Sequence, residues 1–166
     1  CTLNNCIVYY NTANNGYGPN YDSSTLNYCC TTPAPASGVS NFIVEPQLAN
    51  TCRLSANSPC RGVGSAGYSS GVDIDGEAWL NPPSIGCDEY HAGAVTGPLS
   101  VAVATAWTDV ATGFELELRA LIEGHASASA WDFGAGVVVS NQLYTSHAWT
   151  AHGIYAVVLR AWNENN

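Results

Sequence analysis

The cysteines of this chain are confined to its first half. All seven lie within the first 87 residues, and no cysteine follows Cys87. The sequence contains no CxxC pair, which disfavours a zinc site, and disulfides formed in an oxidising, extracytoplasmic compartment account for the cysteines better. Because the count is odd, at least one thiol stays unpaired or bonds to another chain. The seven are Cys1, Cys6, Cys29, Cys30, Cys52, Cys60 and Cys87.

The spacing of these cysteines suggests stacked coils. Cys6, Cys30 and Cys52 follow one another at intervals of 24 and 22 residues. Intervals of that size are typical of solenoids, in which each coil stacks on the next. The segments between them contain short strand-like runs and Asn-rich turns, with no helical periodicity. Cysteines one coil apart then lie above one another, so we expect Cys6 to pair with Cys29 or Cys30, and Cys60 with Cys87.

The second half of the chain has a different pattern. In residues 114–122 (FELELRALI), apolar or small side chains at 114, 116, 118 and 120 alternate with charged ones at 115, 117 and 119, which is the period of a half-buried β-strand. Residues 99–106 and 154–162 alternate in the same way. Short alternating strands separated by Gly-containing turns predict a β-sandwich. The Gly97-Pro98 step is the expected linker between the halves.

Charge excludes several classes of function. The chain contains 13 acidic residues, four arginines and no lysine, and its net charge is −9. No basic patch can form to replace the counterions of phosphates, so nucleic acid and anionic lipid are not expected partners. No apolar run approaches the roughly 20 residues that a membrane-spanning helix needs, so membrane insertion is not expected either.

The stretch AWDFGAG, at residues 130–136, allows two interpretations. It is either a glycine loop that cradles a ligand or a tight turn between two strands. Phosphate loops and dinucleotide fingerprints both require a following helix, and no helical pattern follows here. We therefore expect a structural turn formed by Trp131, Asp132, Gly134 and Gly136, with the glycines adopting backbone geometry that other residues resist.

Acidic residues alternate in the sequence GVDIDGE. Asp73, Asp75 and Glu77 offer carboxylate oxygens of the kind that bind Ca²⁺, although the spacing is not that of an EF-hand. Asp88 and Glu89 complete such a site if their segment folds beside the loop. The alternative is a solvated Asp-Gly turn. A pair of these carboxylates also has the composition of a glycosidase site, but catalysis is the weaker interpretation.

Three aromatic residues near the acidic segment are candidates for stacking on sugar rings: Trp79, Tyr90 and Tyr68. The alternative for each of them is packing in the core or at a sheet edge, because aromatic side chains contribute much of a core's buried area.

Sequence motifs in the first half resemble those of a known family. LSANSPC at residues 54–60, DIDG at 73–76 and GCDEY at 86–90 are similar, in order and wording, to the C-terminal coils of bacterial secreted right-handed parallel β-helix proteins. The resemblance covers about residues 1–93. It implies a β-helix in a large secreted or surface-anchored protein, and it implies no activity.

The second half resembles the polycystic-kidney-disease (PKD) domain, an immunoglobulin-like sandwich. SAWDFGAG followed by SHAWTAHGIYAVVLRAWN carries the resemblance, which covers residues 98–166. It implies that Trp131 fills the core and that the glycines shape a strand-to-strand turn. Ala135 replaces the family's usual acidic residue, and Trp149 stands where a tyrosine is common. The family closes its sandwich with one more strand than this sequence contains, so an unclosed edge is expected. Two explanations stay open: the sequence is a piece of a longer protein, or a neighbouring subunit supplies the missing pairing.

Together these features predict an all-β chain, with the end of a right-handed parallel β-helix at residues 1–93 and a small PKD-like β-sandwich at 98–166. The expected function is that of a non-catalytic extracellular structural or adhesive protein. It would self-assemble into a surface filament or a larger assembly through the open β-helix end and the unclosed sandwich edge. The alternative is a carbohydrate-binding accessory region of a larger secreted polysaccharide-degrading enzyme, with glycans as ligands. Ca²⁺ is the only cofactor that the sequence suggests.

Overall fold

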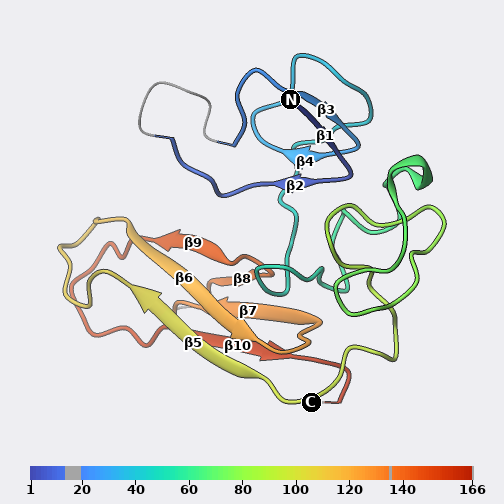
Figure 1. The fold of residues 1–166 in the computed structure, drawn as a ribbon. Coiled ribbons are helices and arrows are strands. Elements are labelled where there is room, and N and C mark those ends of the chain that lie inside the picture. Colours follow the sequence, from blue (N-terminus) through green and yellow to red (C-terminus); the bar gives the residue numbers. More distant parts are fainter. Residues whose placement is uncertain (14–19, 135, 166) are drawn as a thin grey trace. The chain divides into compact units, whose positions relative to one another are not determined.

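The computed structural model describes residues 1–13, 20–134 and 136–165 (Figure 1). Ala135, which differs from the PKD pattern, lies outside the described residues. The chain divides into two compact units. The N-terminal unit comprises Cys1–Pro46 and Cys52–Tyr90, and the C-terminal unit comprises Gln47–Thr51 and His91–Asn166. Residues 47–51, which the sequence interpretation assigned to the first domain, thus belong to the second unit.

The described residues form β-strands, turns and one 3-10 helix, η1 (Ala66–Tyr68), with no α-helix among them. Within this described part, no helix is long and apolar enough to cross a membrane. The mostly-β class expected from the sequence is confirmed.

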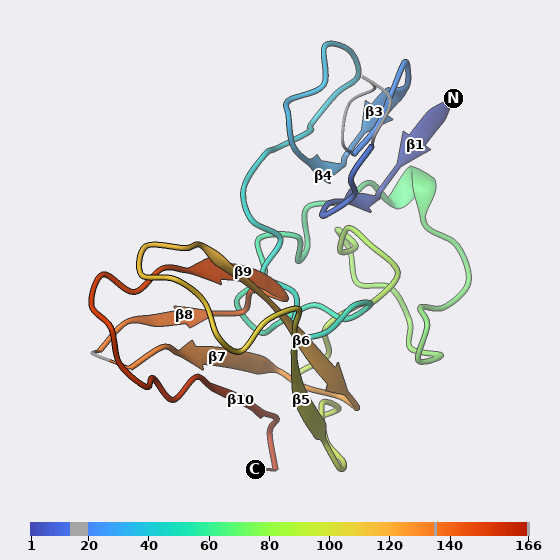
Figure 2. The same cartoon turned by 90° about the vertical axis from the view of Figure 1, so that its left-hand side faces the viewer.

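The strands of the N-terminal unit form two small parallel sheets (Figure 2). Strand β1 (Thr2–Asn4) pairs with β3 (Thr25–Asn27), and β2 (Ile7–Val8) pairs with β4 (Cys30–Thr31). In both sheets each residue is opposite the residue 23 positions later, as in Thr2↔Thr25 and Ile7↔Cys30. Within the first of these sheets, the side-chain amide of Asn27 donates a hydrogen bond to the side-chain oxygen of Asn4, its opposite residue, at 2.9 Å.

The rest of this unit departs from the expected β-helix. Beyond β4, the described residues of the unit form turns, bends, isolated bridges and η1, without a further strand. Prolines and glycines recur through this region, as in GVGSAG at 62–67 and NPPSIG at 81–86, and these residues weaken or interrupt strand ladders. The unit therefore shows two small parallel sheets and not a clear β-helix.

A compact core nevertheless holds the N-terminal unit together. Its buried side chains include Leu26, Leu54 and Ile85, each at most 2 % exposed. Asn5 ties the loops to this core, because its side chain accepts from the Ser65 N–H and donates to the Ser65 carbonyl, both at 2.9 Å. Hydrogen bonds of this kind replace strand ladders as the partners of the loop backbone.

The C-terminal unit is a β-sandwich of two antiparallel sheets (Figures 1 and 2). One sheet has the order β5-β6-β9 and the other has the order β10-β7-β8. The first consists of β5 (Ser100–Thr105), β6 (Leu116–Glu123) and β9 (Tyr144–His147), and the second of β7 (Ala128–Asp132), β8 (Val138–Ser140) and β10 (Val158–Trp162). The sandwich expected from the alternating pattern is confirmed.

Strand β6 shows why the alternating sequence folds in this way. Leu116, Leu118 and Ile122 are all at most 7 % exposed, while the charged residues between them point outward. The strand begins two residues later than expected. Phe114 lies outside it and is 47 % exposed, because its N–H bonds back to the Ala111 carbonyl in a turn.

Strand β10 is also shorter than its alternating sequence indicates. It begins at Val158, not Ile154, and Ile154 is fully exposed. Its partner β7 explains this difference: Val158 is opposite Asp132, the last residue of β7, after which the chain turns. Residues 154–157 have no continuation of β7 to pair with.

Candidate functional site

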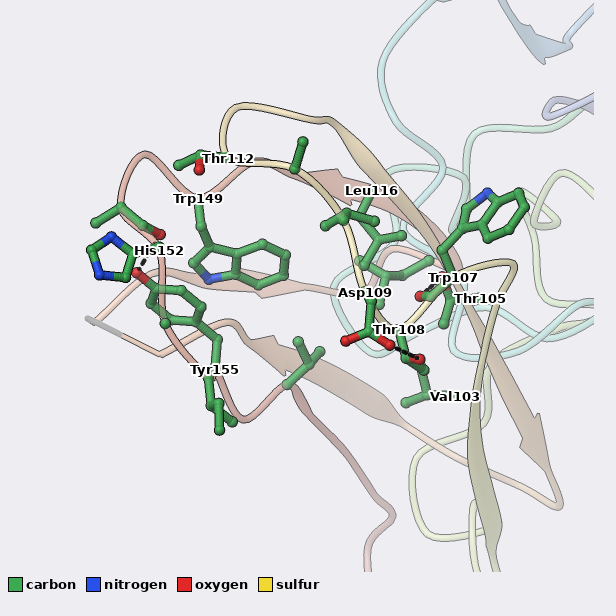
Figure 3. A pocket seen from close by; sticks show the side chains of 17 residues that line it. Val103, Thr105, Trp107, Thr108, Asp109, Thr112, Leu116, Trp149, His152 and Tyr155 are labelled. Carbon is green, nitrogen blue, oxygen red and sulfur yellow. Dashed lines mark hydrogen bonds between the residues drawn. The ribbon is translucent and has the colours of Figure 1, made fainter.

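An open groove lies on the C-terminal unit (Figure 3). It has a volume of about 630 Å³. Val103 and Thr105 of β5, Leu116 and Leu118 of β6, the loop 107–112 and the segment 149–157 contribute its walls. The groove is thus the place where the inner faces of the sandwich are left uncovered.

The inner face of β5 is exposed along the strand. Val101 and Val103 are opposite Ile122 and Ala120 of β6, both of which are buried. Residues opposite each other in an antiparallel pair share one face of the sheet, so both valines point toward the sandwich interior. They are nevertheless 38 % and 41 % exposed. An apolar inner face is therefore open to solvent at this edge.

Both strands beside this opening are edge strands. Among the described residues, β5 pairs with β6 alone and β10 pairs with β7 alone. The two edge strands also approach each other. An edge strand presents a row of unpaired N–H and C=O groups, which can pair with a further strand.

A chain of ring contacts runs from the sandwich core to the groove. Trp131 and Phe133 are buried and stack with their centroids 6.1 Å apart. Phe133 stacks on His147 at 4.6 Å, His147 meets the edge of Trp149 at 4.6 Å, and Trp149 stacks on Tyr155 at 5.2 Å. Trp149 and Tyr155 line the groove (Figure 3). The groove wall is therefore anchored in the core.

The groove is rich in aromatic and polar side chains. Trp107 is 62 % exposed at its rim, close to Asp109 and Thr108, which hydrogen-bond to each other at 3.2 Å. The sequence interpretation did not single out Trp107, Trp149 or Tyr155 as binding residues. No pattern in the sequence distinguishes a tryptophan on a groove from one in a core.

The WDFG segment forms a turn between β7 and β8. Gly134 donates its N–H to the Asp132 carboxylate at 2.9 Å, and Val137 donates to the Gly134 carbonyl at 3.3 Å. Gly134 and Gly136 have φ values of +78° and +80°, which favour glycine. Trp131 is fully buried, with its indole N–H donated to the Gln142 carbonyl at 2.8 Å. These four residues do not line the groove.

The acidic segment folds into a cluster that differs from the expected one. Carboxylate oxygens of Asp73, Asp75 and Asp88 lie within 4.8 Å of one another. Glu77 is not in this set, and its backbone N–H instead donates to Asp73 at 2.8 Å. Asp73 also accepts from the N–H groups of Asp75, at 2.9 Å, and Glu89, at 3.0 Å.

The other two carboxylates are likewise engaged by protein donors. Asp75 forms a two-pronged ion pair with Arg53, and this pairing raises the pKa of the Arg53 guanidinium. Asp88 accepts from the Leu54 N–H at 2.8 Å, and its burial raises its pKa to about 6. A Ca²⁺ ion takes six to eight oxygen ligands. Three carboxylates that already bind protein donors fit a clamp between loops better than they fit a calcium site.

The three candidate sugar-stacking residues lie in different environments. Tyr90 is 7 % exposed and its ring is covered by the Arg61 guanidinium, 4.2 Å from the ring centroid, so it offers no open face to a sugar. Trp79 is half-buried, with its indole nitrogen enclosed. Tyr68 is 50 % exposed and meets the edge of the Tyr28 ring at 6.2 Å. The structure does not bring the three together into one platform.

All seven cysteines lie within the described residues. The structure places the Cys6 thiol beside that of Cys29, one of the two partners expected for it. It places Cys60 beside Cys30, whereas the coil spacing had suggested Cys87 as its partner. Beyond β4 the chain does not continue as regular coils, so the interval between cysteines does not determine which of them are neighbours there.

Comparison with known proteins identifies the C-terminal unit. Residues 100–166 match the family model described as the PKD domain. The searches of curated proteins and of solved structures each found no match for the chain. PKD domains usually occur in extracellular or surface proteins, as adhesive or accessory regions. No match covers the N-terminal unit, and nothing supports the expected β-helix family there.

Proposed function

We propose that this chain is a non-catalytic structural or adhesive part of an extracellular protein, and that it assembles with further copies of itself by strand addition. The PKD domain supports the extracellular setting. The observation that carries the assembly is the apolar inner face of β5, where Val101 and Val103 stay exposed beside the unpaired edge of β10.

A strand added at this edge would supply both backbone hydrogen bonds and apolar side chains. Its backbone pairs with the open edge of β5 or β10, and its apolar side chains cover Val101, Val103 and the groove. Burying apolar area stabilises a contact by about 25 cal/mol per Å². A solvent-exposed inner face is therefore a favourable place for an added β-strand.

A second copy of this chain is the proposed donor of that strand. Charge does not forbid the contact, because only 10 % of the residues are charged and the groove contains a single carboxylate, Asp109. The N-terminal unit supplies a strand with an open edge: among the described residues, β1 pairs with β3 alone. A contact between two different surfaces of identical chains repeats without closing, and it produces filaments.

The β-helix interpretation of the N-terminal unit belongs to this proposal. The constant offset of 23 residues in the two parallel sheets, and the Asn4–Asn27 hydrogen bond between equivalent positions, support a coil that begins at β1 and stacks on the next coil. Further coils, from a preceding segment or another copy, would stack on β1 in the same register.

Electron microscopy combined with native mass measurement tests the proposal. Ordered filaments or a ladder of oligomers are expected at micromolar concentration. A strictly monomeric chain at all accessible concentrations would contradict assembly.

A carbohydrate-binding accessory role is the second candidate, and the groove favours it. Trp107, Trp149 and Tyr155 offer ring faces beside Asp109 and His152, a combination suited to sugar rings and hydroxyl groups. Binding to an array of polysaccharides that is lost in Trp107→Ala, but kept in Tyr68→Ala, would support this role. Absence of binding to every glycan would leave the structural role alone.

A further inference from the structure

The seven thiols of the N-terminal unit carry an inference about covalent structure. The proposed function does not use them, and their arrangement rests on contacts within this unit alone. We propose that three disulfides hold the oxidised unit together, joining Cys6 to Cys29, Cys30 to Cys60 and Cys52 to Cys87, with Cys1 outside the set.

The pairing of Cys6 with Cys29 follows from the register of the second parallel sheet. Ile7 is opposite Cys30, and Cys30 donates its N–H to the Cys6 carbonyl at 3.0 Å. Cys6 directly precedes Ile7, and Cys29 directly precedes Cys30, so the same register places Cys6 opposite Cys29. Neighbouring strands are about 4.8 Å apart, and disulfides span Cα separations of about 4.4–6.8 Å. The two thiols also hydrogen-bond, which lowers the pKa of Cys6 to about 6 and raises that of Cys29.

The pairing of Cys30 with Cys60 follows from the core. Both residues are fully buried. Their thiols are within hydrogen-bond reach, and this contact is the main cause of the raised pKa of Cys30. Successive side chains of an extended strand point in opposite directions, so Cys30 faces away from the Cys6–Cys29 pair and toward Cys60.

The pairing of Cys52 with Cys87 follows from contacts between the residues next to them, which belong to or bind the acidic cluster. The Cys87 sulfur lies 3.3 Å from the Cys52 carbonyl oxygen. The ion pair of Arg53 with Asp75 and the hydrogen bond of Leu54 to Asp88 hold the two flanking segments together. Burial and the neighbouring Cys52 sulfur raise the pKa of Cys87. The coil-spacing argument missed Cys52, since it compared intervals and not loop contacts.

Each bridge forms by thiol–disulfide exchange with an oxidant that itself carries a disulfide. A protein thiolate attacks the oxidant and releases one thiolate from it; the second protein thiolate then attacks the mixed disulfide and releases the other. Two protein thiols are oxidised, one oxidant disulfide is reduced to two thiols, and two protons are transferred with the electrons. In each pair the thiol that is deprotonated attacks first, because the thiolate is the nucleophile.

Digestion of the oxidised, alkylated protein without reduction tests this connectivity. Cleavage after arginine and before aspartate separates four cysteine peptides: 1–21, 22–53, 54–61 and 75–87. Peptide 22–53 contains Cys29, Cys30 and Cys52, so it is expected to be linked to each of the other three. A species that joins 54–61 to 75–87 without 22–53 would overturn the proposal, as would seven alkylated thiols before reduction.

Serine variants of the three cysteines in peptide 22–53 distinguish the three bridges from one another. Each variant is expected to release one peptide and keep the other two: Cys29→Ser releases 1–21, Cys30→Ser releases 54–61 and Cys52→Ser releases 75–87. If Cys29→Ser releases 54–61 instead, Cys29 pairs with Cys60 and the assignment is wrong. Cys1→Ser is the matched control and is expected to leave all three links intact. If a variant folds poorly, the wild-type digest still tests whether peptide 22–53 is linked to each of the other three peptides.

Discussion

The carboxylate of Asp88 accepts a hydrogen bond from the Leu54 N–H at 2.8 Å, and the Asp88 residue is only 5 % exposed. Two further carboxylates, Asp73 and Asp75, lie close to it. Burial and these like charges outweigh the hydrogen bond, so the pKa of Asp88 rises from 3.8 to about 6. One buried carboxyl group thus makes the stability of the N-terminal unit depend on pH.

The sign of that dependence is fixed by the raised pKa. The folded unit binds the proton more readily than the unfolded chain, so the contribution of Asp88 to stability is complete below pH 3.8 and is lost as the pH rises through 6. The loss is on the order of 1–3 kcal/mol. We expect Asp88→Asn to flatten the pH dependence and to be more stable than wild type at pH 7.5. Urea unfolding of both proteins at pH 4.5 and 7.5 measures the free energy of unfolding. If this free energy changes with pH by the same amount in Asp88→Asn as in wild type, Asp88 is not the cause of the pH dependence.

The buried indole of Trp131 predicts a large and local loss of stability. Trp131→Ala removes a fully buried side chain and its hydrogen bond to Gln142, which costs about 3–5 kcal/mol. Trp107→Ala, at a position 62 % exposed, is the matched control and should change the free energy of unfolding by less than about 0.5 kcal/mol. Equal losses measured by chemical denaturation would place the core of the sandwich elsewhere.

Two glycines with positive φ are expected to respond differently to alanine. At Gly134 no atom lies within 4 Å of an added Cβ, so Gly134→Ala costs only the left-handed conformation, about 1–2 kcal/mol. At Gly124 the added Cβ would lie 2.3 Å from the Pro98 carbonyl oxygen, so the loss is larger. Gly134→Asn should be milder than Gly134→Ala, because asparagine tolerates this region. The reverse order in thermal melting would contradict the left-handed conformation of this turn as the source of the loss.

The hydrogen bonds that Asp73 accepts from neighbouring loops predict that calcium does not change the thermal stability of the N-terminal unit. Because Asp73 already accepts three backbone hydrogen bonds, millimolar Ca²⁺ should leave the thermal midpoint of the N-terminal unit unchanged, compared with the same protein in a chelator. Asp73→Ala should lower that midpoint, since it leaves buried N–H groups without acceptors. A calcium-dependent rise that disappears in Asp75→Asn would show that the cluster binds metal.

The C-terminal unit was largely predictable because its strands follow a simple period. The alternation in residues 116–123 reflects a real division between buried and exposed faces. The errors at Phe114 and Ile154 share one cause. A strand ends where its partner ends, and the pairing partner is not encoded in the strand's own sequence.

The N-terminal unit was less predictable because its contacts are specific and irregular. The coil interval was close to the observed offset of 23 residues for the first pair of strands. Beyond β4, the fold depends on side-chain contacts such as Asn5 with Ser65 and Arg53 with Asp75. These contacts have no periodicity, so spacing arguments assigned no partner to Cys52 and did not indicate that Cys60 lies beside Cys30. The expectation that Asp88 would join the acidic cluster agrees with its position beside Asp73 and Asp75.

The most direct test of assembly places a charge on either face of β5. Val103→Glu puts a carboxylate on the inner face that an added strand must bury, while Ala102→Glu puts the same charge on the outer face. Both positions are exposed, so both variants should fold as wild type does. Sedimentation velocity across a range of concentrations is the measurement. We expect oligomers for wild type and Ala102→Glu and monomers for Val103→Glu; identical sedimentation of all three proteins would contradict strand addition at this edge.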